Sequence, residues 1–552
     1  MNDTNRDGET ATGPYGKRPL HEILRAHARS RPDHPAYLWY GAALGYGELD
    51  RASDAFAARL AQLGVARGEP VALYMQNCPQ YVIAHYAIQK IGAVVCPVGP
   101  LSREHELHYQ LDDLQARVLV AAAPLLDVVE QVRARTALEH VFVVHYDDLL
   151  PQQPSIDVPE ELLAMRRARD GHAGASHVAA EDFLAATRTD ARPPQVDVAL
   201  DEIALVPYTA GTMGMPKGAM LSHGNALYKT AASSEAYRVT ADDVLLAVAP
   251  LYHIAGMLTG VDVPVYAGAT VVLLYRFDAR AALQAIERHR VSWWYGFAPM
   301  HVAAMKLPDA QRFDLSSLRL NPVTSFGIRF TETIARRWRE HAPNCVSFEA
   351  AYGLTETHTM DTCMPPDAIR WGTHGRPVPG NEIRIADPMT GAPRQTGESG
   401  EILIRGPGVF RGYWKRPEAT AQALRDGWLH TGDIGYLDED GYLTFEGRFK
   451  EMIKVSGYSV FPEEVESILL RHPAVAQVGV IGMPDPEKGE IPRAFVVLKT
   501  GAAGTVSEDE MAQWARENMA AYQVPREIVF CESLPATATG KLLRRLLKGE
   551  DR

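Results

Sequence analysis

The sequence contains few cysteines, and they form no recognisable metal-binding or redox motif. Only five of the 552 residues are cysteines, and no two of them have the CxxC spacing. We therefore expect reduced thiols in a cytoplasmic protein, and no cysteine metal site.

Excess positive charge, a secretory leader and a membrane-spanning run are also missing. The net charge of −12 disfavours nucleic acid or an anionic membrane as a partner, because both require a basic face. Residues 1–7 are polar and lack the apolar stretch of a signal peptide. The most apolar region, 244–274, is interrupted by a histidine, an aspartate and two prolines, so we predict buried core there and no integral membrane segment.

Helical and strand patterns alternate in the first third of the chain. The predicted helices are 49–63, 79–91 and 104–113, and the predicted short buried strands are 71–75, 93–98 and 118–122. This alternation indicates a parallel α/β fold. Residues 151–198 have weak periodicity and are interpreted as an inserted or connecting segment more than as a core element.

The chain changes in character twice towards its C-terminus. Between 372 and 445 the helical period disappears, and short apolar runs separated by Gly and Pro predict a β-rich subdomain. After Arg448 the pattern is mixed, with a helix opened by Pro462, strands at 475–481 and 494–498, and a helix from Glu508. We interpret this last stretch as a separate C-terminal domain.

Hydroxyls, glycines and one lysine are concentrated in residues 208–218, directly after an apolar run. Hydroxyls donate hydrogen bonds, glycines let the backbone approach an anion, and a lysine supplies compensating charge. The residues concerned are Thr209, Gly211, Thr212, Gly214 and Lys217. We interpret the segment as a loop that holds a polyphosphate, with ATP as the candidate ligand. Its Pro-Lys-Gly order differs from the Gly-Lys-Ser/Thr of a Walker loop, which disfavours kinases and P-loop NTPases.

This loop is the first of several motifs that occur in a fixed order. It is followed by Leu-Ser-His at 221–223, Pro-Leu-Tyr-His at 250–253, Tyr-Gly-Leu-Thr-Glu at 352–356, His-Thr-Gly-Asp at 430–433, Gly-Arg-Phe-Lys at 447–450 and Thr-Gly-Lys at 539–541. Over nearly its whole length the chain resembles the adenylate-forming superfamily of acyl-CoA synthetases, aryl-CoA ligases, luciferases and nonribosomal adenylation domains.

The resemblance implies a fold and a reaction. The fold would be α/β: a large N-terminal adenylation domain, 1–447, with two α/β layers and the β-rich subdomain at about 370–447, then a hinge near Lys450 and a small mobile α+β domain, 451–552. In the reaction, a carboxylate would attack the α-phosphate of ATP to give an acyl adenylate and pyrophosphate, and coenzyme A would then take the acyl group. Cations and Mg²⁺ would neutralise the charge that this step brings together.

The resemblance also assigns roles to single residues of the nucleotide site. Glu356 would ligate Mg²⁺, and Thr355 would contact the α-phosphate. Tyr352 would pack against the adenine. Asp433 would accept hydrogen bonds from the ribose hydroxyls, and Arg448 would reach the ribose or the phosphates.

Further roles concern the acid and coenzyme A. Lys541 would bridge the substrate carboxylate and the α-phosphate, and a pivot at Lys450 would carry it away after adenylation; otherwise Lys541 belongs to a basic tail with Arg544, Arg545 and Lys548. Gly457 would line the pantetheine channel. His253 would cap the acyl site, and a core histidine with satisfied hydrogen bonds is an equal alternative.

Two segments depart from the family pattern. Ala210 and Met213 stand where Ser and Thr are usual, which removes two donors to the phosphates and predicts weaker ATP binding. Residues 325–328 read Ser-Phe-Gly-Ile where Ser-Gly-Gly-Ala is usual, which places Phe326 and Gly327 at the predicted acyl pocket. With Phe297 and the aromatics at 293–295, this pocket would suit a ring or a medium chain; core packing of these aromatics is the alternative.

The sequence therefore predicts an ATP-dependent carboxylic acid:CoA ligase of fatty acid metabolism, most similar to bacterial medium- or long-chain fatty acyl-CoA synthetases. An aryl-acid CoA ligase and an adenylase that loads a carrier protein are alternatives. A degenerate nucleotide-binding protein is a third, against which the retained Lys541, Glu356 and Asp433 argue. The expected partners are the acid, ATP and coenzyme A, and a homodimer is left open.

Overall fold

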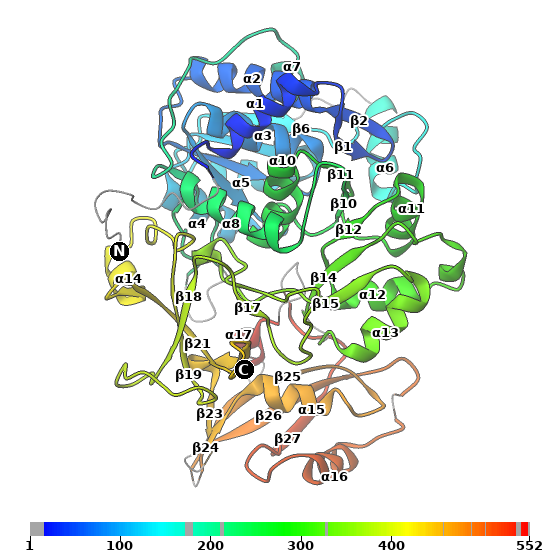
Figure 1. Ribbon diagram of the computed structural model, residues 1–552, viewed down its shortest axis with the longest axis vertical. Coiled ribbons are helices and arrows are strands. Elements are labelled where there is room, and N and C mark those ends of the chain that lie inside the picture. The colour runs from blue at the N-terminus through cyan, green and yellow to red at the C-terminus, as the bar shows by residue number, and fades with distance from the viewer. Residues whose placement is uncertain are drawn as a thin grey trace, which may run out of the picture.

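The chain was analysed as a computed structural model that describes residues 16–171, 180–209, 215–325, 329–455, 458–486, 488–502, 504–536 and 542–549. Figure 1 shows its course: two α/β layers at the top hold the first 350 residues or so, a β-rich region lies below them at the left, and the C-terminal region forms a small mixed unit at the bottom. The predicted α/β class is confirmed.

The first sheet contains most of the strands predicted from the alternating pattern. Its strand order is β7 (Glu181–Asp182), β6 (His140–Val144), β5 (Val118–Ala122), β3 (Pro70–Tyr74), β4 (Val94–Val98), β8 (Ile203–Leu205) and β9 (Leu221–Ser222). All neighbours are parallel except β8 and β9. The helices between its strands are α2 (Tyr46–Gln62, before β3), α3 (Pro79–Lys90), α4 (Glu104–Leu114), α5 (Leu126–Arg133), α6 (Glu160–Gly171) and α7 (Phe183–Thr187). Such crossovers are what a parallel sheet requires.

The second sheet is built mainly from residues 244–349 and is completed by a strand pair from the N-terminus. Its parallel strands are β10 (Val244–Ala247), β11 (Thr270–Leu273), β12 (Trp293–Trp294), β13 (Gly296–Phe297), β14 (Leu320–Thr324), β15 (Val346–Glu349) and β1 (Pro35–Trp39), with β2 (Ala42–Gly45) antiparallel at the edge. Its helices are α8 (His223–Ala236), α9 (Ile254–Met257), α10 (Val263–Ala267), α11 (Ala279–His289), α12 (Ala298–Met305) and α13 (Glu332–His341). The apolar region 244–274 is confirmed as buried core.

Helix α3 joins the two sheets. Every one of its residues is buried, as expected for a helix that is covered on all sides. The Tyr86 hydroxyl donates to the carbonyl oxygen of Val261 at 3.2 Å, in the π-helical segment η2 (Leu258–Asp262) of the second layer. Helix α1 (Leu20–Ser30) packs on α2 and α10 and so also spans both layers.

The interpretation of 151–198 as an inserted or connecting segment more than a core element was wrong for some of its residues. This segment contributes α6, the edge strand β7 and α7, and the ring of Phe183 is buried 4.6 Å from that of Phe56. Elements of two to five residues are too short to leave a periodic pattern, which is why β7 and α7 could not be recognised from the sequence.

Antiparallel strands form the predicted β-rich region. They are the pair β16 (Thr362–Cys363) and β17 (Arg376–Pro377), and the sheet of β18 (Glu382–Ala386), β19 (Gly400–Arg405), β20 (Leu424–Arg425), β21 (Trp428–Leu437) and β22 (Leu443–Arg448), with α14 (Pro417–Ala423) before β20. The C-terminal unit has β23 (Ile453–Val455), β24 (Tyr458–Val460), β25 (Val475–Asp485), β26 (Gly489–Leu498) and β27 (Glu527–Phe530), with α15 (Pro462–Leu469), α16 (Glu508–Asn518) and α17 (Arg544–Leu547). Among the described helices, none is long and apolar enough to cross a membrane.

Candidate functional site

The two ends of the predicted phosphate loop are held together. Tyr208 and Gly218 form an antiparallel bridge, and the Thr209 amide donates to the Lys217 carbonyl oxygen at 2.9 Å. The Tyr109 hydroxyl donates to the carbonyl oxygen of Pro216 at 2.7 Å, which holds the C-terminal end of this segment in place. Thr209 and Lys217 are thus direct neighbours, while Gly211, Thr212 and Gly214 lie outside the described residues.

Tyr413 connects the phosphate loop to the predicted metal ligand. The Lys217 ammonium lies 4.2 Å from the centre of the Tyr413 ring, a cation–π contact. The Tyr413 hydroxyl donates to Glu356 Oε1 at 2.8 Å. Burial and the Glu356 carboxylate raise the pKa of Tyr413, so its hydroxyl stays protonated. Tyr413 was missed in the sequence because nothing in Gly-Tyr-Trp at 412–414 marks it as belonging to a site.

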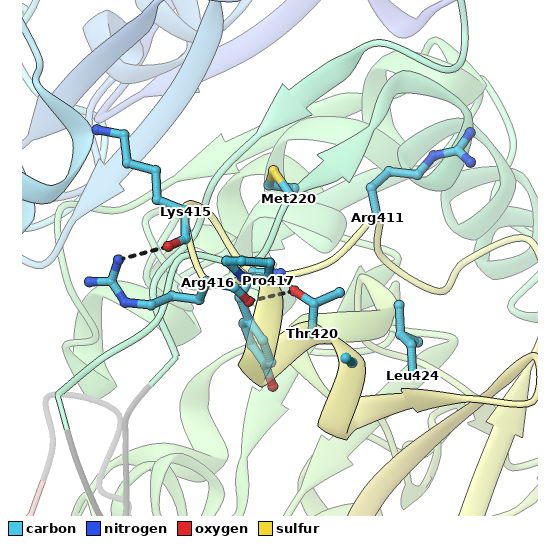
Figure 2. Close-up of a pocket in the computed structure, with 9 residues that line it drawn as sticks. Met220, Arg411, Lys415, Arg416, Pro417, Thr420 and Leu424 are labelled. Atoms are coloured by element: carbon cyan, nitrogen blue, oxygen red, sulfur yellow. Dashed lines mark hydrogen bonds between the residues drawn. The ribbon is translucent and has the colours of Figure 1, made fainter.

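A surface cleft of about 470 Å³ lies beside this tyrosine. Figure 2 shows Lys415 and Arg416 on one side of it and Arg411 on the other. Arg416 is held by an ion pair to Asp113, at 2.7 Å. The lining includes Tyr413 itself, so the cleft adjoins the residue that links Lys217 to Glu356.

Thr355 and Glu356 lie in a tight turn that is followed by unusual backbone. They belong to the 3-10 turn η4 (Thr355–Thr357), and the next three residues, 358–360, have φ values of 56°, 58° and 51°. Left-handed backbone costs roughly 1–2 kcal/mol per non-glycine residue, so three in succession need strong support. Gly353 permits this turn, because a Cβ at that position would overlap the backbone of Thr359 and Met360.

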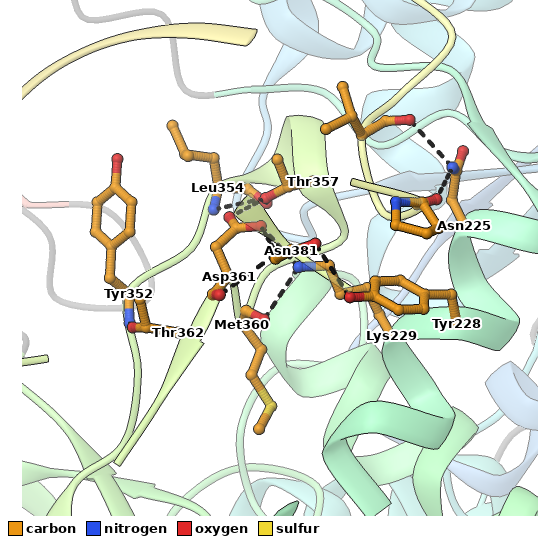
Figure 3. Close-up of polar contacts among 12 residues, drawn as sticks. Asn225, Tyr228, Lys229, Tyr352, Leu354, Thr357, Met360, Asp361, Thr362 and Asn381 are labelled. Atoms are coloured by element: carbon orange, nitrogen blue, oxygen red, sulfur yellow. Dashed lines mark hydrogen bonds and ion pairs between the residues drawn. The ribbon is translucent and has the colours of Figure 1, made fainter. Parts of the chain in front are cut away.

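A buried ion pair supports the left-handed turn. Lys229, on α8, donates from Nζ to the Met360 carbonyl oxygen at 3.0 Å and to Asp361 Oδ1 at 2.7 Å (Figure 3). Both side chains are 0% exposed. Asp361 also accepts hydrogen bonds from Thr357 Oγ1 and, at 2.9 Å, from Asn381 Nδ2. Burial lowers the pKa of Lys229 and raises that of Asp361, and the charge of each partner opposes this for the other.

The predicted nucleoside residues are brought together by the structure. The Tyr352 hydroxyl donates to Asp433 Oδ2 at 2.8 Å, and Arg448 Nε lies 3.1 Å from Asp433 Oδ1. Asp433 and Arg448 are direct neighbours across β21 and β22. The Tyr352 ring stacks on Phe445 with centroids 5.9 Å apart. Burial alone would lower the pKa of Arg448, but the nearby carboxylates, that of Asp433 first, raise it.

The predicted acyl-site residues adjoin an apolar, aromatic cluster. His253 is half-buried at the start of α9, and its Nδ1 accepts a hydrogen bond from the Ala255 amide at 3.4 Å. Ala255 and Phe297 belong to the same buried cluster, in which the rings of Tyr295 and Phe297 meet edge to face at 5.8 Å. Phe326 and Gly327 lie outside the described residues.

Glu349 was missed by the sequence interpretation. It ends β15, is 7% exposed, and accepts hydrogen bonds from the amide and hydroxyl of Ser325. Burial raises its pKa to about 7. This carboxyl group therefore ties the start of the 325–328 segment to the strand that leads into Tyr352.

The C-terminal unit carries the remaining predicted residues. Lys450 is exposed in the short turn η5 (Phe449–Glu451) between β22 and β23. Gly457 and Lys541 lie outside the described residues, and the nearest described residues on either side of Lys541, Ala536 and Leu542, form an antiparallel bridge. Arg544 follows at once and pairs with three carboxylates, those of Glu451, Glu463 and Glu466, at 2.5, 2.9 and 2.8 Å. Arg544 is therefore a structural anchor and does not belong to a free basic tail.

Comparison with known proteins places this geometry in a family. Family models described as AMP-binding enzyme and AMP-binding enzyme C-terminal domain match residues 24–414 and 464–541. The long-chain-fatty-acid–CoA ligase of Bacillus subtilis (strain 168) is 32% identical over 551 residues, 98% of this chain and 95% of its own. The feruloyl-CoA synthase of an Amycolatopsis species is 34% identical over 521 residues, 94% of this chain and 96% of its own. The anthranilate CoA ligase AuaEII, solved in complex with anthranoyl-AMP, superposes with a TM-score of 0.83 at 28% identity and 97% coverage of both chains.

Proposed function

The chain belongs to the family of AMP-binding enzymes and is an AMP-forming acid–CoA ligase, and we propose that its acid is a medium- or long-chain fatty acid. The observation that carries the proposal is the apolar cluster of Ala255, Tyr295 and Phe297 behind His253. An acyl chain placed against these side chains would gain about 0.8 kcal/mol of free energy for each CH₂ that it buries. The similarity to long-chain-fatty-acid–CoA ligases over nearly the whole chain supports the same class.

ATP and coenzyme A are the other substrates of this enzyme class. We propose that Lys217 and the loop glycines hold the phosphates, and that Tyr352, Asp433 and Arg448 hold the nucleoside. Glu356 would hold Mg²⁺, which proteins commonly bind through one or two carboxylates together with nucleotide phosphates. The metal would offset the negative charge of the phosphates, while Thr355 would hold the α-phosphate by a hydrogen bond.

We further propose that the C-terminal domain reorients between the two half-reactions. Lys450 is exposed in the connection between β22 and β23, where a change of backbone angles would disturb little packing. Lys541 would be presented to the acid in the first half-reaction, and Gly457 would line the coenzyme A channel in the second.

An aryl acid is the second candidate. The edge-to-face rings of Tyr295 and Phe297 would pack well against a benzene ring. The similarity to a feruloyl-CoA synthase and to a 4-coumarate–CoA ligase is as strong as that to the fatty acid enzymes. A fatty acid and an aryl acid are both hydrophobic, but the first is a flexible chain and the second carries a flat ring.

The substrate proposal is tested by measuring kcat/KM for thioester formation with fatty acids of graded length and with benzoic and cinnamic acids. We expect a maximum among the fatty acids, with a steady rise of kcat/KM per CH₂ up to the limit of the pocket. In a Phe297→Ala variant the preferred chain length should increase, because the removed ring leaves space. Phe142→Ala, which removes a buried ring from the first sheet, is the matched control and should leave the preference unchanged.

Other outcomes are equally informative. A cinnamic or benzoic acid as the best substrate would replace the fatty acid proposal by the aryl one. Adenylate without thioester would point to a carrier protein as acceptor. A Phe297→Ala variant with the wild-type chain-length profile would remove Phe297 from the acyl pocket.

A further inference from the structure

The buried pair of Lys229 and Asp361 lies next to the adenylation machinery, but the proposed binding of ATP and acid assigns it no ligand. Lys229 comes from the middle of α8, and Asp361 follows the left-handed turn 358–360. The turn begins two residues after Glu356. Neither the nucleotide nor the acid chemistry described above requires a lysine at this position.

The contacts of the pair converge on the segment from Tyr352 to Thr362. The Asp361 amide donates to the Tyr352 carbonyl oxygen at 2.7 Å, and the Tyr352 amide donates to Thr362 Oγ1 at 2.9 Å, so the segment is closed on itself. Thr357 Oγ1 donates to the other oxygen of Asp361. Figure 3 shows Thr357, Asp361 and Lys229 meeting at the base of this closed loop.

The surroundings of Lys229 leave little room for another arrangement. A Cβ at Gly408 would overlap the Lys229 Cε, so the lysine side chain passes directly against the backbone of the β-rich region. The Phe410 amide, two residues on, donates to the Glu356 carbonyl oxygen at 2.8 Å. The turn is thus held between α8 on one side and residues 408–410 on the other.

We propose that Lys229 is a positioning residue for adenylation: by binding the Met360 carbonyl oxygen and Asp361, it holds the left-handed turn and so fixes Thr355 and Glu356 where the nucleotide and its metal are bound. This proposal rests on the proposed roles of Thr355 and Glu356. It goes beyond them, because it makes the first half-reaction depend on a side chain that touches neither ATP nor the acid.

The two half-reactions separate this role from a merely structural one. Acyl-adenylate formation requires both Thr355 and Glu356 to be in place, because ATP brings its α-phosphate and its metal. Thioester formation from preformed acyl adenylate and coenzyme A still uses the contact of Thr355 with the α-phosphate, but it takes place after pyrophosphate has left, when the metal held by Glu356 no longer has to offset the charge of the other two phosphates. In a Lys229→Met variant we expect the kcat/KM for Mg·ATP in adenylation to fall by about ten- to a hundredfold, the range caused by misplacement of catalytic groups. Thioester formation from added acyl adenylate should fall by less, because it depends on the positioning of Thr355 but no longer on the metal at Glu356.

Lys90 provides the matched control. It is also 0% exposed and pairs with two carboxylates, Asp50 at 2.6 Å and Asp54 at 2.8 Å, between α2 and α3. A Lys90→Met variant should lose stability in a similar way but should reduce both half-reactions equally or not at all. All variants are assayed below the temperature at which their unfolding begins.

A double variant, Lys229→Met with Asp361→Asn, keeps the proposal testable if the single variant unfolds. It removes the unpaired buried carboxylate, so it should regain stability. It still lacks the bond to the Met360 carbonyl oxygen, so the adenylation defect should persist.

An equal loss in both half-reactions, or normal adenylation by a folded Lys229 variant, would overturn the proposal. Failure of the wild-type enzyme to form any adenylate would instead refute the proposed substrate class, so the two failures are distinguishable.

Discussion

The molecule fixes two regions of its candidate site with buried ion pairs of different construction. In the N-terminal domain a single cation meets a single anion, Lys229 and Asp361, and both are fully buried. In the C-terminal unit a single cation, Arg544, meets three carboxylates whose side chains are 14–29% exposed. The first arrangement is balanced in charge and closed to water, whereas the second has more carboxylates than its arginine can neutralise and is only partly exposed to water.

The difference predicts how each arrangement responds to a change. When Lys229 is removed, one buried carboxylate remains, and it can be neutralised by a proton. When Arg544 is removed, three carboxylates remain within reach of one another and repel. The charge-balanced pair of Lys229 and Asp361 can hold the turn 358–360 in one conformation. The excess of carboxylates around Arg544 makes the stability of the C-terminal unit sensitive to pH and to the loss of the arginine.

The largest effect is expected from Arg544→Met. Loss of the cation that Glu451, Glu463 and Glu466 share should destabilise the C-terminal unit by about 3–5 kcal/mol, as for other broken buried ion pairs. Urea unfolding and limited proteolysis should show this unit opening before the rest of the chain. Arg526→Met, at an exposed arginine of the same unit, is the control, and equal stability of the two variants would contradict the anchor role of Arg544.

A smaller effect is expected from Gly408→Ala in the N-terminal domain. The added methyl group would meet the Lys229 Cε and must displace it. Adenylation should fall by about tenfold, because small misplacements of positioned groups are costly. Stability should fall by about 1–3 kcal/mol, because the methyl group overpacks a closed site. Gly549→Ala, where the nearest neighbour is an ordinary 3.8 Å contact, should retain full adenylation, and wild-type adenylation by Gly408→Ala would show that Lys229 can move freely.

The smallest effect concerns pH and the carboxylates around Arg544. Burial raises the pKa of Glu463 from 4.5 to about 7. The folded state therefore binds this proton more tightly than the unfolded state, and stability falls as the pH rises from about 4.5 to about 7. Glu463→Gln cannot titrate, so its free energy of unfolding relative to wild type should increase across this window by about 1 kcal/mol, discounted for the water that reaches the side chain. The measurement is thermal unfolding of wild type and Glu463→Gln at a series of pH values. A constant difference in stability between the two proteins from about pH 4.5 to about pH 7 would refute the prediction.

Local pattern predicted the regular elements of the fold. The helix and strand expected at 79–91 and 93–98 are α3 and β4, because a long helix and a fully apolar strand have strong signatures. The ordered motifs identified residues such as Glu356 and Asp433. They could not identify Lys229 and Asp361, which are 132 positions apart and gain their role only by meeting. Tyr413 and the anchoring role of Arg544 were also missed, since a lone tyrosine or a basic residue near the end of a chain has no distinctive spacing.

Tyr413 separates the positive charge of Lys217 from the negative charge of Glu356. Within the described residues, Lys217 and Glu356 form no ion pair with each other; each contacts a different side of the same phenol group. Because the neutral tyrosine lies between these opposite charges, Lys217 and Glu356, both in the described part of the chain, have no ion pair with each other that must be broken when a nucleotide enters. The tyrosine thus keeps Lys217 and Glu356 from pairing with each other. Both charged groups stay available to a bound nucleotide and its metal.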